Sequence, residues 1–181
     1  MANSNTICAC HGVAASGNVT AETAFGQASA TTVRAFAQMP STIGNDFLDG
    51  RELLVRAAWI ATTGGVITYQ PAIRFYRGDQ TGLTTFTNDV AIAVPTAVSI
   101  STTTRLLMIK AWLWWDKTTA RLNGHYCLQA DTAFTAYATL TAGLSTNVAN
   151  ASSIGFFSTG IFGTTQASNT AILKYLEIDA L

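Results

Sequence analysis

The apolar residues of this sequence recur at the spacing of short β-strands, and nowhere at the spacing of a long amphipathic helix. From Thr31 to Leu181, segments rich in β-branched and aromatic residues alternate with turns that contain Gly, Asn and Asp. About eight to ten such strands without helices predict an all-β fold, an antiparallel two-sheet sandwich of jelly-roll type. The segments predicted to be strands are 31–38, 52–61, 66–77, 90–94, 97–101, 105–115, 120–130, 134–141, 152–162 and 171–179.

The N-terminal segment has a different character. Residues 1–30 are rich in Ala, Ser, Gly, Thr and Asn, and they keep neither a helical nor a strand period. A segment of this composition buries too little apolar surface to offset its ordering entropy, so it becomes ordered only against another surface. We therefore predict two parts, an extended N-terminal arm at 1–30 and a β-sandwich domain at 31–181.

Charged residues are scarce. Only 11% of the residues are charged, against about 25% in an average soluble domain, and ten basic and ten acidic residues cancel. Such a chain lacks the clustered Lys and Arg that binding to nucleic acid or an anionic membrane requires. No Asp, Glu, Lys or Arg occurs from Thr132 to Leu173, although polar residues interrupt every apolar run before it reaches membrane-span length. We expect protein partners to cover this surface, among them copies of the chain in a closed oligomer such as a homotrimer.

The cysteines and the first residues bear on metal binding and on the site of synthesis. The sequence begins without the basic and apolar regions of a signal peptide, so we expect synthesis in a cytoplasm. Three soft ligands lie within four residues at Cys8, Cys10 and His11, but a structural zinc site needs a second ligand pair. The distant candidates are His125 and Cys127. We expect small buried thiols and no bound metal.

Strand alternation is clearest in the neighbouring segments 105–115 and 120–130. Apolar residues occupy the odd positions of the first segment, and apolar or small residues the even positions of the second. A turn at their junction would pair Leu113 with Leu122, with Tyr126 facing the core as well. The sequence therefore predicts a β-hairpin with one buried face.

The opposite face of this hairpin supplies the candidate interface residues. They are two tryptophans and three polar residues, Trp112, Trp114, Arg121, Asn123 and His125, and Trp114 beside Arg121 is a candidate cation–π pair. Large aromatic rings on an outward face require a cover. Three possibilities remain for what shields these rings from solvent, namely another part of the same subunit, a neighbouring subunit, or a sugar ring stacked on a tryptophan.

Catalytic motifs are missing from the sequence. It contains no Gly-x-Ser-x-Gly elbow, Walker loop, His-Glu-x-x-His sequence or Rossmann glycine run. Most aspartates lie at predicted turns, where they commonly serve as turn residues. Asp116 and Asp131 remain as a candidate acid–base pair. We expect a protein that is not an enzyme and has no cofactor.

The hairpin sequence resembles a known family. The segment Ala111–Gly124, AWLWWDKTTARLNG, is similar to a strand–turn–strand hairpin of jelly-roll proteins from tailed bacteriophages. In those proteins a strand ending in Trp-Asp is followed by a short Thr/Ser turn and then by Leu-x-Gly. The match covers these residues well, and the rest of the chain is similar only in its composition.

This resemblance implies a non-enzymatic virion structural protein, a capsid decoration or cement protein. Such proteins bind the outside of the capsid, are often trimeric, and stabilise the shell by bridging neighbouring capsomers. The implied partners are a major capsid protein and copies of the chain, with no nucleic acid and no membrane, and the implied location is the capsid surface after synthesis in the host cytoplasm. The alternative is a phage tail or receptor-binding protein with a carbohydrate-binding β-sandwich.

Overall fold

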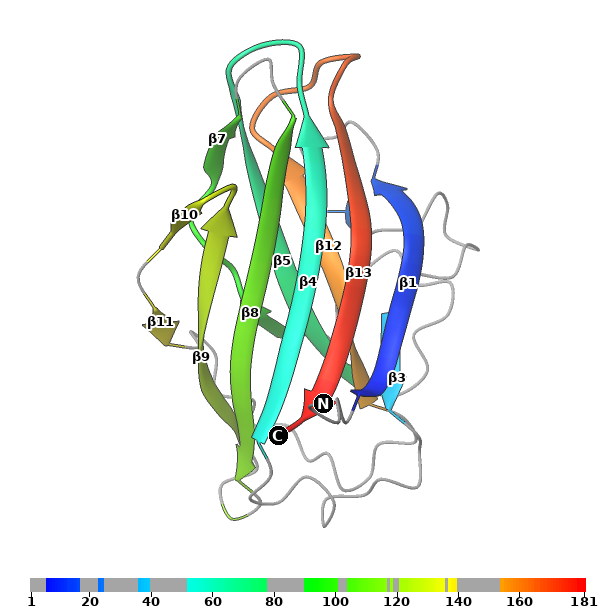
Figure 1. Ribbon diagram of the computed structural model, residues 1–181, viewed down its shortest axis with the longest axis vertical. Coiled ribbons are helices and arrows are strands. Elements are labelled where there is room, and N and C mark those ends of the chain that lie inside the picture. The colour runs from blue at the N-terminus through cyan, green and yellow to red at the C-terminus, as the bar shows by residue number, and fades with distance from the viewer. Residues whose placement is uncertain are drawn as a thin grey trace.

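The computed structural model describes residues 6–16, 23–24, 36–39, 52–77, 90–100, 104–116, 118, 121–135, 137–139 and 154–181. No helix occurs among these residues, and every strand pairing between them is antiparallel. The strands form two sheets packed face to face (Figure 1). The predicted fold class, an all-β antiparallel two-sheet sandwich of jelly-roll type, is confirmed.

The sheet nearer the viewer in Figure 1 contains seven described strands in the order β1-β13-β4-β8-β9-β10, with β11 also paired to β9. Its long strands are β1 (Thr6–Ser16), β4 (Glu52–Thr62), β8 (Arg105–Asp116), β9 (Arg121–Ala130) and β13 (Thr170–Ala180). The two short ones are β10 (Ala133–Phe134) and β11 (Ala138–Thr139).

The second sheet contains six described strands in the order β2-β12-β5-β6, with β3 paired to β12 and β7 paired to β5. Its strands are β2 (Thr23–Ala24), β3 (Phe36–Met39), β5 (Ile67–Arg77), β6 (Val90–Ala93), β7 (Val98–Ile100) and β12 (Ile154–Phe162). Strands β5 and β12 form its centre.

The core lies between the sheets and follows the strand period. The odd-numbered residues from Leu53 to Ala61 in β4 and from Leu107 to Leu113 in β8 are almost completely buried, and the even-numbered residues between them lie toward the outer side of the sheet. Trp59 is fully buried and donates a hydrogen bond from Nε1 to Ser158 Oγ at 2.8 Å, which joins the sheets through the core. The pattern that predicts the strands therefore also predicts which residues they bury.

Eight of the predicted strand segments are confirmed with ends within two residues of those observed. They correspond to β4, β5, β6, β7, β8, β9, β12 and β13. The segment 31–38 is observed as the shorter β3, and residues 31–35 lie outside the described part of the chain.

The prediction of one strand at 134–141 is wrong. The chain instead forms β10 and β11, separated by a shift of one residue in their pairing with β9. The cause is Thr135, whose hydroxyl accepts a hydrogen bond from Leu128 N at 2.9 Å. This side chain takes the place of a backbone carbonyl, and the regular ladder stops there.

Part of the predicted arm forms a strand. Residues Thr6–Ser16 are β1, which pairs with β13 along the edge of the seven-stranded sheet. The segment is thus extended and lies against the sandwich. Much of the remainder of 1–30 lies outside the described residues, and the boundary between arm and domain stays a prediction.

The predicted hairpin is confirmed, but its predicted register is wrong by two residues. Leu113 lies opposite Gly124 and not opposite Leu122. Because the error is an even number, the faces are unchanged, and Leu113 and Tyr126 are both buried as expected. The turn has the expected length of four residues but begins one residue later than predicted, since Asp116 pairs with Arg121.

Candidate functional site

Five aromatic side chains lie on the outward side of β8, β9 and the segment that follows β9. They are Trp112, Trp114, His125, Phe134 and Tyr137, and we call them the aromatic face. Three of the rings are strongly exposed, at 43% for Trp114, 64% for Phe134 and 67% for Tyr137. Trp112 and His125 are half-buried.

The centre of the aromatic face is a cluster of three rings. Trp112 and His125 lie directly opposite each other on β8 and β9, and their rings stack with centroids 5.4 Å apart. The Tyr137 ring stands edge-on to both, with centroids 5.6 Å from Trp112 and 5.4 Å from His125. These contacts hold the Tyr137 ring against Trp112 and His125 on the paired strands β8 and β9.

The remaining predicted interface residues lie toward the hairpin turn. Trp114 is opposite Asn123, which is half-buried on the same face. The predicted Trp114–Arg121 neighbours are not directly paired, because the two-residue register shift places Arg121 opposite Asp116. The Arg121 side chain lies outside the described part of the structure, so the cation–π pair is not tested.

Tyr137 and Phe134 are the members of the aromatic face that the sequence analysis missed. Residues three apart on a regular strand point to opposite sides. The one-residue shift after Thr135 removes this conflict and brings both rings to the outward side. Phe134 lies opposite Gln129, which in turn lies opposite the outward-facing Met108. The only signal in the sequence was the presence of two aromatic residues in an uncharged segment.

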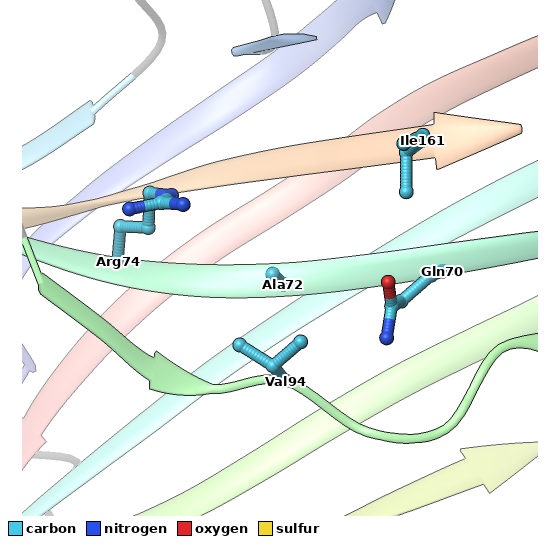
Figure 2. A pocket seen from close by; sticks show the side chains of 5 residues that line it. All are labelled: Gln70, Ala72, Arg74, Val94 and Ile161. Atoms are coloured by element: carbon cyan, nitrogen blue, oxygen red, sulfur yellow. The ribbon is translucent and has the colours of Figure 1, made fainter. Parts of the chain in front are cut away.

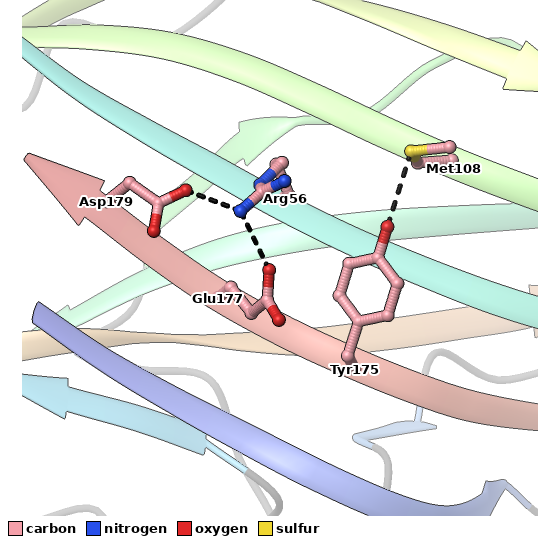
Figure 3. A network of polar contacts seen from close by, with 5 residues as sticks. All are labelled: Arg56, Met108, Tyr175, Glu177 and Asp179. Atoms are coloured by element: carbon pink, nitrogen blue, oxygen red, sulfur yellow. Dashed lines mark hydrogen bonds and ion pairs between the residues drawn. The ribbon is translucent and has the colours of Figure 1, made fainter. Parts of the chain in front are cut away.

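A charged cluster lies beside the aromatic face, on β4 and β13 (Figure 3). Arg56 Nη2 is 2.6 Å from Asp179 Oδ2 and 2.9 Å from Glu177 Oε2. The Tyr175 hydroxyl donates a hydrogen bond to Met108 Sδ at 3.4 Å, and burial raises the pKa of this tyrosine. Both carboxylates therefore pair with Arg56 Nη2 within the chain, whereas Arg56 Nε is buried and has no hydrogen-bond partner.

The free thiol of Cys127 is part of the same outward side. It lies opposite Lys110 on β8 and is buried, as expected for a small packed side chain. Burial raises the pKa of this thiol, and the charge of Lys110 opposes the shift in part. A thiol that is buried and protonated is a poor nucleophile and a poor metal ligand.

The ligands considered for a zinc site are far apart in the fold. Cys8, Cys10 and His11 are on β1, whereas His125 and Cys127 are on β9. Three strands separate β1 from β9 in the sheet, which places their backbones about 19 Å apart. The two segments cannot share one ion within this subunit. Among the described residues, no three His, Cys, Asp or Glu side chains come together in a possible metal site.

The candidate acid–base pair is likewise not assembled. Asp116 ends β8, whereas Asp131 accepts a hydrogen bond from Leu106 N at 3.0 Å near the start of the same strand. Ten residue steps separate these positions, or about 33 Å along the strand. Asp131 lies in the turn after β9, where its backbone has a positive φ of 52° and its side chain forms an ion pair with Arg105 at 3.3 Å.

Part of the uncharged segment from Thr132 to Leu173 is explained by burial within the subunit. Phe156 and Phe157 are adjacent in β12 and are both fully buried, so both sides of this strand are covered. A central strand covered on both sides carries no charge because burying an unpaired charge is costly. The absence of charge in β12 therefore does not by itself indicate a neighbouring subunit.

Comparisons with known proteins give distant structural matches. No family model and no curated protein sequence matches the chain. The Lotus tetragonolobus seed lectin matches with a TM-score of 0.45 and 8% identity over 83% of this chain and 82% of its own. Peanut lectin with a nine-residue peptide matches with a TM-score of 0.43 and 9% identity over 99% of this chain and 93% of its own. Lectin I of Ulex europaeus with the methyl glycoside of α-L-fucose matches with a TM-score of 0.41 and 7% identity over 93% of this chain and 85% of its own.

These matches are similar to the chain in their β-sandwich architecture, and at this level of similarity they carry no inference about its ligand. Within the described residues, no helix is long and apolar enough to cross a membrane.

Proposed function

We propose that this protein is a non-enzymatic structural subunit of a virus particle, a tailed-phage capsid decoration protein. It binds the outside of the shell and bridges neighbouring capsomers. The observation that carries the proposal is the aromatic face, on which Trp114, Phe134 and Tyr137 are 43–67% exposed. Clustered exposed aromatic rings are the residues that anchor protein–protein contacts.

The arrangement of the aromatic face favours a pre-formed interface. Trp112, His125 and Tyr137 already contact one another, so little side-chain freedom is lost when a partner binds. The nearby Arg56 is paired with Glu177 and Asp179. Attraction to this region therefore depends on apolar contact more than on charge, and we expect its binding to be only weakly sensitive to salt.

The partners of the proposal are a major capsid protein and copies of the chain, arranged as a homotrimer on the capsid surface. The neutral composition supports this choice, because ten basic and ten acidic residues leave no net attraction for nucleic acid or anionic lipid. Assembly would follow synthesis in the host cytoplasm.

The test is the composition of purified particles and the binding of variants to them. Mass spectrometry should find the chain in particles at a copy number comparable to that of the shell protein. Particles stripped of the chain should take up the wild type in a pelleting assay, but not the double variant Trp112→Ala/Tyr137→Ala. Val66→Ser is the matched control, because Val66 is 76% exposed in a turn apart from the aromatic face. Absence from particles, or equal binding by all three proteins, would refute the proposal.

A second candidate function is carbohydrate binding by a phage tail or receptor-binding protein. The observation that favours it is that the outward rings of Trp112 and Trp114 lie opposite His125 and Asn123, whose polar groups suit sugar hydroxyls. A glycan array with the isolated protein separates the two candidates. Binding that depends on Trp112 would favour this function, and no binding together with particle association would favour decoration.

A further inference from the structure

The outward side of the six-stranded sheet carries a pocket that is separate from the aromatic face. Its volume is about 140 Å³, and its described lining residues are Gln70, Ala72, Arg74, Val94 and Ile161 (Figure 2). Gln70, Ala72 and Arg74 alternate along β5 with the core residues Tyr69 and Ile73. The pocket therefore opens away from the core.

The floor and walls of the pocket are apolar. Ala72 is buried at the centre, and its single methyl group leaves the space that a longer side chain would fill. Val94 and Ile161 stand on either side, and Ile161 lies directly opposite Gln70 on β12. The body of a small ligand would rest on this floor, with room for one ring or a short chain.

The two ends of the pocket are polar and differ in their chemistry. The Gln70 amide donates from Nε2 to Pro95 O at 2.8 Å, which fixes the amide and leaves Oε1 as the acceptor on the pocket side (Figure 2). Arg74 lies four residues along the strand, about 13 Å between Cα atoms. Arg74 already makes an interaction within the chain, but the five N–H donors of its guanidinium allow it to hold a further partner.

The wall formed by Val94 and Pro95 is held from both sheets. Tyr126 of β9 donates a hydrogen bond to Val94 O at 3.0 Å, and Gln70 of β5 donates to Pro95 O. A wall fixed at two successive carbonyls needs little reorganisation when a ligand enters. This part of the pocket is therefore pre-formed.

From this geometry we infer that the pocket binds a small organic carboxylate that also carries a hydroxyl group, such as an acidic sugar. The carboxylate is held by the Arg74 guanidinium, whose planar N–H groups match two carboxylate oxygens. The hydroxyl donates to Gln70 Oε1, and the carbon skeleton lies on Ala72. The site is on the opposite sheet from the aromatic face, so it does not depend on the proposed function.

The experiment uses D-glucuronate as the probe and D-glucose as the neutral control, titrated into the full-length protein and followed by NMR of backbone amides. Glucuronate should shift the signals of β5 and Val94, and glucose should not. Arg74→Gln should weaken glucuronate binding about tenfold or more, because it removes a charge-assisted contact. Ala72→Val should weaken binding by filling the floor.

Two controls make the outcome decisive. Arg105→Gln removes an arginine that pairs with Asp131 on the other sheet, and it should leave binding unchanged. Trp112→Ala should also leave it unchanged, which separates this site from the aromatic face. The inference is overturned if glucuronate does not shift the β5 signals, if glucose binds equally well, or if a correctly folded Arg74→Gln protein binds glucuronate like the wild type.

Discussion

Gly124 is the residue on which the geometry of the β8–β9 hairpin depends. Its φ is +154°, and a Cβ atom built on it would lie 2.0 Å from the carbonyl oxygen of Trp112. Any other residue would force the two strands apart where Leu113 lies opposite Gly124. The close approach of β8 to β9 thus requires glycine here.

Gly124→Ala should destabilise the protein by about 1–3 kcal/mol, because it adds a strained φ and a clash with backbone. Gly65→Ala is the control, since a Cβ there would meet only the end of the flexible Gln166 side chain, at 3.3 Å. Chemical denaturation of both variants gives the comparison. If the two variants have the same free energy of unfolding, the prediction is wrong, because β8 and β9 would then separate at position 124 at no cost in free energy.

Two buried tyrosines differ in whether their hydroxyl has a partner. The Tyr69 hydroxyl is buried in the core near Gly160 and has no hydrogen-bond partner, whereas the Tyr126 hydroxyl donates to Val94 O at 3.0 Å. Tyr69→Phe should therefore raise the free energy of unfolding by about 1 kcal/mol, and Tyr126→Phe should lower it by a similar amount. Urea denaturation measures both. Loss of stability in Tyr69→Phe would mean that a bound water serves this hydroxyl.

Burial of tyrosines also predicts how stability depends on pH. Burial raises the pKa of Tyr69 well above its usual value, and it raises the pKa of Tyr126 and Tyr175 as well. The folded state therefore holds these protons more tightly than the unfolded state. The contribution of these protonated tyrosines to the free energy of unfolding is complete below about pH 10, the usual tyrosine pKa. It is lost as the pH rises through their pKa values in the folded state. Denaturation between pH 8 and 11 should show this loss, and Tyr69→Phe should reduce its slope. An unchanged slope would contradict the prediction.

At the scale of elements, the β8–β9 hairpin separates a structural side from a candidate binding side. Leu113 is fully buried between the sheets, and its neighbour Trp112 is half-buried on the outward side. Adjacent residues of one strand thus have different roles because strand side chains alternate. The same division holds in β5, where Ile73 is in the core and Arg74 is at the pocket.

Leu113→Ala should cost about 2–5 kcal/mol of stability through lost burial and a cavity. Trp112→Ala should cost much less stability and should instead weaken attachment to particles. Chemical denaturation and particle pelleting of the two variants separate these effects. If Trp112→Ala unfolds the protein as severely as Leu113→Ala and binding per folded molecule is unchanged, the aromatic face is internal packing.

At the scale of the whole molecule, the sandwich presents different chemistry on its two outer sides. The seven-stranded sheet carries the aromatic face, and the six-stranded sheet carries the pocket with Arg74. The segment at Val94 and Pro95 is hydrogen-bonded to both sheets, through Tyr126 and Gln70. A chain of zero net charge has little repulsion between copies, which suits assembly into an oligomer.

The purified protein should form a homotrimer or another closed oligomer, because the exposed rings of the aromatic face require a cover. Light scattering coupled to size exclusion at micromolar concentration should give a mass near three times the 19.1 kDa of one chain. Trp114→Ser should shift the distribution toward smaller species, whereas Val66→Ser should not. A single species at the mass of one chain would contradict the prediction.

From the sequence alone, eight of the strands and the buried face of the β8–β9 hairpin could be predicted, whereas β1 was missed. Alternation with a period of two is a local property, so Leu113 and Tyr126 could be assigned to the core without knowing their partners. The same property allowed the error in register, because a shift of two residues leaves every face unchanged.

Only the tertiary structure decided what depends on contacts across the sheets. The Thr135–Leu128 hydrogen bond breaks the ladder and brings Tyr137 onto the aromatic face, which no local pattern indicates. The strand order separates Cys10 from Cys127, although both were candidate ligands of one metal. Strand order and pairing shifts are set by long-range packing and by single side-chain hydrogen bonds. These interactions join residues far apart in the chain and therefore leave no periodic trace in the sequence.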